Sequence, residues 1–232
     1  MDSWGRDARR EAVKTEKTEK TDVEQGRWAM PRQHWKLLTI GTAAGLLIGL
    51  AGVQAAQDEL VIFDFEGTTH EWAIPDWAQT SKDYVGKSMS ASTDFVSHGK
   101  GSLQLMVDFP GGAWHGAYVE QMMSTTDWSP FDAIAADVYV PYNAPKGLKA
   151  RFILTVGDKW TWTEMNRGLP LVPDQWTTIT ATVKSGSLDW KFFPDETFRK
   201  DVRKVGIRIE SDGATYQGPI YIDNVRLIKA AP

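Results

Sequence analysis

Apolar residues at every second position recur along most of the chain, in about eight short segments separated by Gly, Pro, Asp and Asn. Examples are residues 103–107 (LQLMV), 152–156 (FILTV) and 205–209 (VGIRI). A period of two is the signature of a β-strand, because successive side chains point to opposite faces. Helical periodicity is limited to a turn near residues 194–204. We therefore predict an all-β fold, an antiparallel β-sandwich (jelly roll) of two sheets, over residues 56–232.

The N-terminal part of the chain has a different composition. Residues 1–29 are rich in both charge signs and poor in aliphatic side chains, which predicts a disordered extension. Residues 30–55 follow the order of a secretory signal peptide: basic residues, an uncharged run, and Val53-Gln54-Ala55 as a cleavage site. Because Met30 lies where a compact signal would begin, we expect it to be the biological start, with cleavage after Ala55.

An uncleaved membrane anchor is the alternative for this segment. Residues 37–57 are uncharged and long enough to span a bilayer, and Gly41, Gly45 and Gly49 form a stripe of small residues. Contact with a membrane is expected only through this segment, if it is uncleaved. Basic residues precede the run, so both versions place the domain outside the cytoplasm, either secreted or periplasmic, or anchored to the outer side of the membrane. N-terminal sequencing of the exported protein distinguishes the two.

Composition excludes several classes of function. The chain contains no cysteine, which rules out disulfide scaffolds and thiol chemistry, and its net charge of -4 disfavours nucleic acid as a partner. Its 11 Trp residues must either fill a core or present flat faces to a ligand. The sequence assigns no oligomeric state.

The alternation indicates which side chains point away from the core of the predicted sandwich. One set of strands directs aromatic and charged groups outward, whereas strand 177–183 directs only threonines outward. One sheet is therefore expected to carry ligand-binding groups on its outer face, and the other to be featureless. Indole planes can stack on a sugar ring, and ionised side chains form strong hydrogen bonds to its hydroxyl groups. We therefore predict non-catalytic binding of a glycan chain by the residues Trp114, Tyr118, Glu120, Arg151, Trp160, Trp162, Arg208 and Glu210.

Some of these aromatic residues have a structural alternative. Trp160 and Trp162, expected to share one row, could instead cover the core edge at a hairpin. Trp176 opens an alternating strand and is expected to be structural. Arg208 is expected to lie on the sheet surface without a buried partner, so that its removal would weaken binding more than folding. The remaining loop tryptophans could be core lids or walls of the site: Trp72, Trp77, Trp128 and Trp190.

Five short motifs resemble a known family. They are residues 63–66 (FDFE), 97–103 (SHGKGSL), 137–141 (DVYVP), 175–179 (QWTTI) and 221–227 (YIDNVRL). Their order and spacing over about residues 60–229 resemble the jelly-roll carbohydrate-binding modules, of galactose-binding-like fold, that are appended to plant-cell-wall glycoside hydrolases. The resemblance implies a concave sheet that binds a glycan chain. It also implies a structural Ca²⁺ near the first and last strands, held by Asp64, Glu66 and Asp223; alternatively, Asp223 and Asn224 simply form a turn or bulge.

Two other classes of function remain open at this stage. A β-sandwich glycoside hydrolase or lyase would need paired carboxylates, for which Glu120, Glu164 and Glu210 are the candidates, with His115 nearby. No Gly-x-Ser-x-Gly nucleophile motif occurs. A surface adhesion domain that uses the sandwich to bind another protein is the other alternative. Release of reducing sugar would identify the first, and binding of a protein but no glycan would identify the second.

Overall fold

The computed structural model describes residues 58–229 of the chain. The predicted extension over residues 1–29 and the predicted signal or anchor over residues 30–55 lie outside the described residues, as do the first two positions of the domain. Within residues 58–229, no helix is long and apolar enough to cross a membrane.

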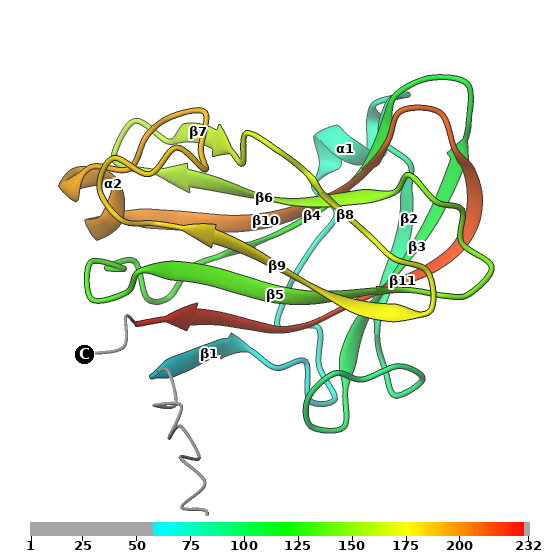
Figure 1. Ribbon diagram of the computed structural model, residues 1–232, viewed down its shortest axis with the longest axis horizontal. Coiled ribbons are helices and arrows are strands. Elements are labelled where there is room, and N and C mark those ends of the chain that lie inside the picture. The colour runs from blue at the N-terminus through cyan, green and yellow to red at the C-terminus, as the bar shows by residue number, and fades with distance from the viewer. Residues whose placement is uncertain (1–57, 230–232) are drawn as a thin grey trace, which may run out of the picture. The chain divides into compact units, whose positions relative to one another are not determined.

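Eleven strands of the described chain form two antiparallel sheets that pack face to face, as the alternation predicts (Figure 1). The first sheet has the order β2-β3-β11-β5-β9, with β1 paired to β11. Its strands are β1 (Glu59–Phe63), β2 (Gly86–Ser92), β3 (Ser102–Pro110), β5 (Ala133–Val140), β9 (Gln175–Thr182) and β11 (Thr215–Ile228). The second sheet has the order β4-β10-β6-β7, with β8 paired to β6. Its strands are β4 (His115–Met122), β6 (Lys149–Val156), β7 (Thr161–Glu164), β8 (Leu169–Pro170) and β10 (Val202–Ser211).

Two short helices connect the strands. Helix α2 (Glu196–Lys200) coincides with the turn predicted near residues 194–204, and Asp195 caps it by accepting a hydrogen bond from the backbone N–H of Phe198 at 2.7 Å. Helix α1 (Asp76–Thr80) was not predicted, because five residues are too few to show a helical period. Its N-cap is Pro75, which makes no side-chain cap hydrogen bond, and the helix carries Trp77.

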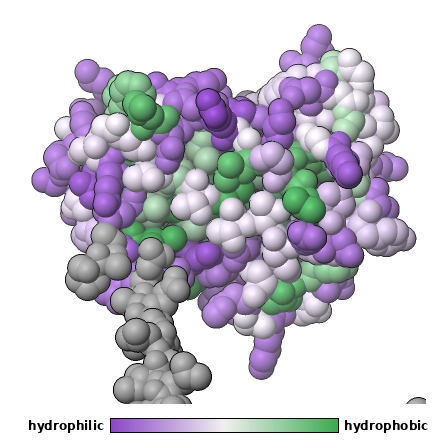
Figure 2. All heavy atoms as spheres, in the orientation of Figure 1, coloured by the Kyte–Doolittle hydropathy of each residue, from purple (hydrophilic) through white to green (hydrophobic). Residues whose placement is uncertain are grey.

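The core lies between the two sheets and consists of the inward side chains of the alternating strands. Leu103, Leu105 and Ile207, for example, are fully buried. Three of the loop tryptophans are core residues as well: Trp72, Trp128 and Trp190 are at most 3% exposed. The exposed apolar residues form separate patches on a largely hydrophilic surface in the view of Figure 2.

Candidate functional site

The outer face of the second sheet gathers most of the side chains that the alternation directed outward. Strand β10 lies between β4 and β6, and Arg208 pairs in register with Tyr118 on one side and Arg151 on the other. On the neighbouring pair of strands, Trp162 lies opposite Thr155. Because residues in register share a face, these side chains come together on one surface.

Five aromatic rings form a continuous band on this surface, which we call the aromatic band. Its ring centroids are 5.5 Å apart for Trp162 and Tyr118, 5.4 Å for Tyr118 and Trp77, 4.8 Å for Trp77 and Tyr84, and 5.9 Å for Tyr84 and Trp114. The three indoles are exposed, at 43% for Trp77, 38% for Trp114 and 43% for Trp162, whereas Tyr118 is buried beneath them. The band therefore presents three indoles to solvent on a supporting layer of phenol rings.

The alternation directs Trp114, Tyr118 and Trp162 to this face. Trp77 is one of the loop tryptophans expected to be core lids or walls of the site, and it lies in the band, whereas Tyr84 was not predicted there. Both come from the segment that runs along the free edge of β4, where Tyr84 forms a bridge to Gly116. This attachment is a tertiary contact between irregular backbone and a strand, so no periodicity reveals it. The only signal for Trp77 was its large aromatic side chain in a loop.

Trp160 lies apart from the aromatic band. It precedes β7 in a turn and has a φ of 55°, which ends the alternation that would have put it in the row of Trp162. Its ring instead lies 5.4 Å from the guanidinium carbon of Arg203. No aromatic contact within residues 58–229 joins Trp160 to the band.

The packing of Tyr118 depends on a glycine in the neighbouring strand. A Cβ atom at Gly206 would overlap the phenol ring, so only glycine lets the ring lie across β10. The Tyr118 hydroxyl donates to Glu120 Oε2 at 2.8 Å, and Lys204 Nζ donates to Glu120 Oε1 at 2.6 Å. Burial and the nearby Glu120 carboxylate raise the pKa of Tyr118, so the phenol remains a hydrogen-bond donor.

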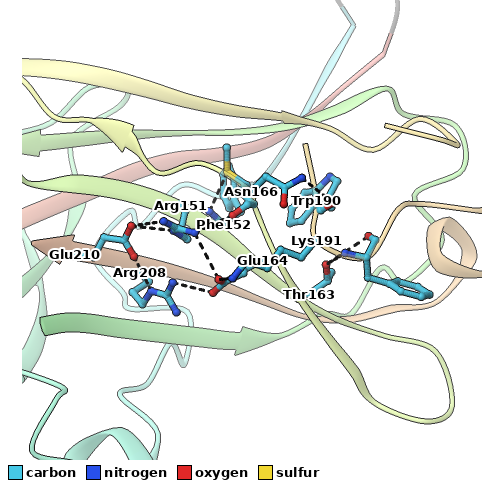
Figure 3. Close-up of polar contacts among 11 residues, drawn as sticks. Arg151, Phe152, Thr163, Glu164, Asn166, Trp190, Lys191, Arg208 and Glu210 are labelled. Atoms are coloured by element: carbon cyan, nitrogen blue, oxygen red, sulfur yellow. Dashed lines mark hydrogen bonds and ion pairs between the residues drawn. The ribbon is translucent and has the colours of Figure 1, made fainter. Parts of the chain in front are cut away.

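Next to the aromatic band lies a ring of two arginines and two glutamates, which we call the ion-pair network (Figure 3). Arg208 contacts Glu164 Oε2 through Nη2 at 2.8 Å and Glu210 Oε2 through Nε at 3.1 Å. Arg151 contacts Glu210 Oε1 through Nε at 3.1 Å and Glu164 Oε1 through Nη1 at 3.5 Å. Lys191 adds a further ion pair to Glu164. The network therefore links β6, β7 and β10 with the loop that carries Lys191.

The ion-pair network is buried, which corrects the expectation that Arg208 has no buried partner. Arg208 is 7% exposed, Glu164 8% and Glu210 4%. Burial alone would raise the pKa of Glu164, but Lys191, Arg208 and Arg151 outweigh it and hold this pKa below its usual value. The two glutamates likewise raise the pKa of Arg208 against the effect of burial. Glu164 and Arg208 are therefore both charged near neutral pH.

The network and the aromatic band are in direct contact. The guanidinium carbon of Arg208 lies 5.4 Å from the centroid of the Trp114 ring, a cation–π geometry that supports this indole from below. The site thus combines exposed aromatic planes with charged donors and acceptors whose positions are already set. Of the eight residues predicted for it, Trp160 alone lies outside this arrangement among the residues described.

The three carboxylates assigned to Ca²⁺ are engaged by other partners. Asp64 Oδ1 pairs with His70 Nε2 at 2.8 Å, and this contact lowers the pKa of Asp64. Glu66 Oε1 accepts from the backbone N–H of Lys100 at 2.7 Å, and Asp223 Oδ2 accepts from the backbone N–H groups of Ser97 and His98 at 2.8 and 3.0 Å. Within residues 58–229, no three His, Asp or Glu side chains are grouped to hold a metal ion. This donor set therefore does not fit the expected site; Glu66 and Asp223 hold the loop over residues 97–101 instead, and Asp64 pairs with His70.

Removal of divalent cations is accordingly expected to leave the stability unchanged. The loop is held by hydrogen bonds within the chain, so the melting temperature with EDTA should equal that with CaCl₂. Differential scanning calorimetry measures both. A bound Ca²⁺ at 100 times its Kd would add about 2.7 kcal/mol to the free energy of unfolding, so a clear upward shift with CaCl₂ would restore the calcium hypothesis.

Comparison with known proteins identifies the family of this chain and structures that share its fold. The family described as "Mannanase, galactose-binding domain-like" matches residues 63–224. No curated protein matches significantly. The module CBM27-1 of Caldicellulosiruptor saccharolyticus, solved with mannohexaose, is 21% identical with a TM-score of 0.51, over 73% of this chain and 96% of that one. A module specific for non-crystalline cellulose, CBM28, is 14% identical with a TM-score of 0.53, over 71% and 91% of the two chains. At these identities the two structures show a shared fold.

Proposed function

This chain belongs to the family of galactose-binding-like domains of mannanases, and on this premise we propose that it binds a neutral polysaccharide chain on the outer face of its second sheet without cleaving it. The observation that carries the proposal is the aromatic band beside the ion-pair network. Three exposed indoles supply stacking planes for sugar rings. The adjacent arginines and glutamates supply charged hydrogen-bond partners for the hydroxyl groups.

The geometry of the band favours a single chain over a flat crystalline surface. The rings of Trp77 and Trp162 are inclined to each other by 73°, so the exposed indoles of the band do not form one flat surface. A flexible oligosaccharide can follow such a surface by rotating about its linkages. The ligand class we propose is a mannan or glucan chain, the classes bound by the two structurally similar modules.

Affinity in the micromolar range is a reasonable expectation for such a face. Fully burying a large apolar side chain contributes roughly 1.5–3 kcal/mol, before the cost of ordering the ligand. Three indole contacts then contribute roughly 4.5–9 kcal/mol before that cost, a range that includes the free energy of about -8 kcal/mol for a micromolar Kd. The preformed network reduces the ordering cost, because its side chains are held by each other before the sugar arrives.

The electrostatics of the glutamates favour binding over hydrolysis. A glycosidase needs one carboxylic acid that stays protonated, with a raised pKa, to protonate the leaving oxygen. Glu164, one of the candidates for that role, has a lowered pKa because three cationic side chains surround it. Glu210 is held in ion pairs by both arginines. The face therefore has the electrostatics of a fixed recognition surface.

A glycan panel probed with the full chain tests this proposal. Mannohexaose, cellohexaose and xylohexaose are immobilised, binding is measured on each, and reducing ends are counted after prolonged incubation. We expect binding to the mannan or glucan ligands with no increase in reducing ends. If no member of the panel binds, the proposal is contradicted. If reducing ends are released, the face belongs to an enzyme.

Export from the cytoplasm stays a prediction, because it depends on residues 30–57, which lie outside the described part of the chain. The choice between a secreted and an anchored form depends on cleavage after Ala55.

A further inference from the structure

The outer face of the first sheet carries a row of chemically distinctive side chains, contrary to the expectation that it is featureless. Tyr139 on β5 pairs in register with Trp176 on β9 and with Tyr221 on β11. Tyr221 pairs in turn with Gln104 on β3, which pairs with Ser90 on β2. These five residues form one row across five neighbouring strands of the first sheet, β9, β5, β11, β3 and β2, which we call the cross-strand row.

Phe95 covers the middle of the cross-strand row. Its ring stacks on Tyr139 with a centroid distance of 4.4 Å and an interplanar angle of 20°, and it lies 5.0 Å from the ring of Tyr221. The two tyrosines are buried beneath it, whereas Phe95 itself is 37% exposed. One part of the Phe95 ring therefore rests on the sheet while another part remains open to solvent.

The polar atoms of the row are tied together. Tyr139 donates its hydroxyl hydrogen to Asp174 at 2.8 Å, and Gln104 Nε2 donates to the Tyr221 hydroxyl at 3.0 Å. Tyr221 in turn donates to Asp94 Oδ2 at 3.5 Å. Gln104 and Asp94 are thus positioned by Tyr221 rather than left free to rotate in solvent.

A pocket of about 520 Å³ lies at the β2–β3 end of the cross-strand row, and Asp94, which precedes Phe95 in the chain, is one of its lining residues. Its lining residues are Gly67, Ser90, Ala91, Ser92, Thr93, Asp94 and Gln104. They supply hydroxyl groups, one amide and one carboxylate, and none of these lining residues is cationic. The volume lies within the range of small-molecule sites. Such a lining suits a neutral polyhydroxylated ligand and repels an acidic one, because the single charge is negative.

We propose that this pocket and Phe95 form a second glycan-binding site, which takes the end of a neutral hexose chain. The terminal sugar would enter the pocket and hydrogen-bond with Asp94 and Gln104, and the next sugar would stack on the exposed part of the Phe95 ring. The site lies on the sheet opposite to the aromatic band. It therefore goes beyond the proposed function and does not require the first face to bind.

The test uses mannohexaose and cellohexaose as probes for the full chain, with amide chemical shifts as the readout. We expect each binding probe to shift amides of residues 90–95 and the side-chain amide of Gln104, and these shifts should persist in the Trp77→Ala/Trp162→Ala double variant. Ser90→Tyr should fill the pocket and weaken this binding at least about tenfold. Ser88→Tyr is the matched control, since Ser88 is an exposed residue of the same edge strand outside the pocket lining.

The outcomes separate the two proposals. Shifts confined to the aromatic band would overturn the second site alone, whereas shifts confined to residues 90–95 and Gln104 would overturn the first face alone. Equal binding in the Ser90→Tyr and Ser88→Tyr variants would also overturn the second site. If Ser90→Tyr lowers the melting temperature more than its control, Gln104→Ala replaces it, and unchanged binding in that variant would contradict the role given to the amide.

Discussion

Replacing Arg208 by alanine is expected to lower the free energy of unfolding by about 3–5 kcal/mol, because it leaves two buried glutamates with one of the two arginines that they share. Arg208 bonds to Glu164 and Glu210, and all three residues are at most 8% exposed. Removing Arg208 leaves two largely buried carboxylates with fewer cationic partners, and neither Arg151 nor Lys191 takes its place at Glu164 Oε2 and Glu210 Oε2. Urea denaturation of the variant and the wild type measures the loss.

Lys149→Ala is the matched control for this substitution. Lys149 also forms an ion pair within the chain, with Asp212 at 2.7 Å, but the two side chains are 38% and 71% exposed. Because exposed pairs contribute little, its loss should barely change the unfolding midpoint. If Arg208→Ala lowered the free energy of unfolding as little as Lys149→Ala, the ion pairs of the network would contribute no more than exposed ones. The description of the network as buried and held in place before ligand binding would then be wrong.

Trp162→Ala and Trp77→Ala should each weaken glycan binding by about 2 kcal/mol or more, which is roughly 30-fold in Kd, as for central residues of a binding surface. Each indole is 43% exposed and belongs to the aromatic band, so it offers a plane to the ligand while the core does not depend on it. Isothermal titration with the oligosaccharide that responds in the glycan panel measures the change. Thermal melts of the same variants should remain close to the wild type.

Trp160→Ala tests whether glycan affinity depends on a place in the aromatic band or only on the exposure of an indole. Its indole is 49% exposed, but its contact is with Arg203 and it lies outside the band. The variant should therefore keep the wild-type affinity. A loss at Trp160 equal to that at Trp162 would move the site toward the turn before β7, and retained affinity in both Trp77 and Trp162 variants would exclude the band.

The alternation in the sequence was sufficient for the sandwich and for the outward direction of most site residues. Both follow from a local property of extended backbone, in which neighbouring side chains point to opposite faces. Val119 and Ile207 are fully buried, whereas Tyr118 and Arg208, their neighbours in the chain, lie on the outer face. The same rule failed at Trp160, where a single residue with positive φ interrupts the strand.

What surrounds each outward side chain was decided by the tertiary structure. Four tryptophans in loops look alike in the sequence, yet Trp72, Trp128 and Trp190 fill the core and Trp77 joins the aromatic band. The difference depends on which strand each loop packs against, and that is set only when the strands pair into sheets.

The sequence by itself therefore determined the fold class, because the repeated alternation is a local property, and its five short motifs carried the resemblance to the family. It did not determine that Arg208 is enclosed by Glu164 and Glu210, or that Tyr139 and Tyr221 align into a row beneath Phe95. Those arrangements depend on which strands are neighbours and in what register they pair. Partners that lie 44 residues apart, such as Arg208 and Glu164, leave no periodic trace in the chain, so only the assembled sheets bring them together.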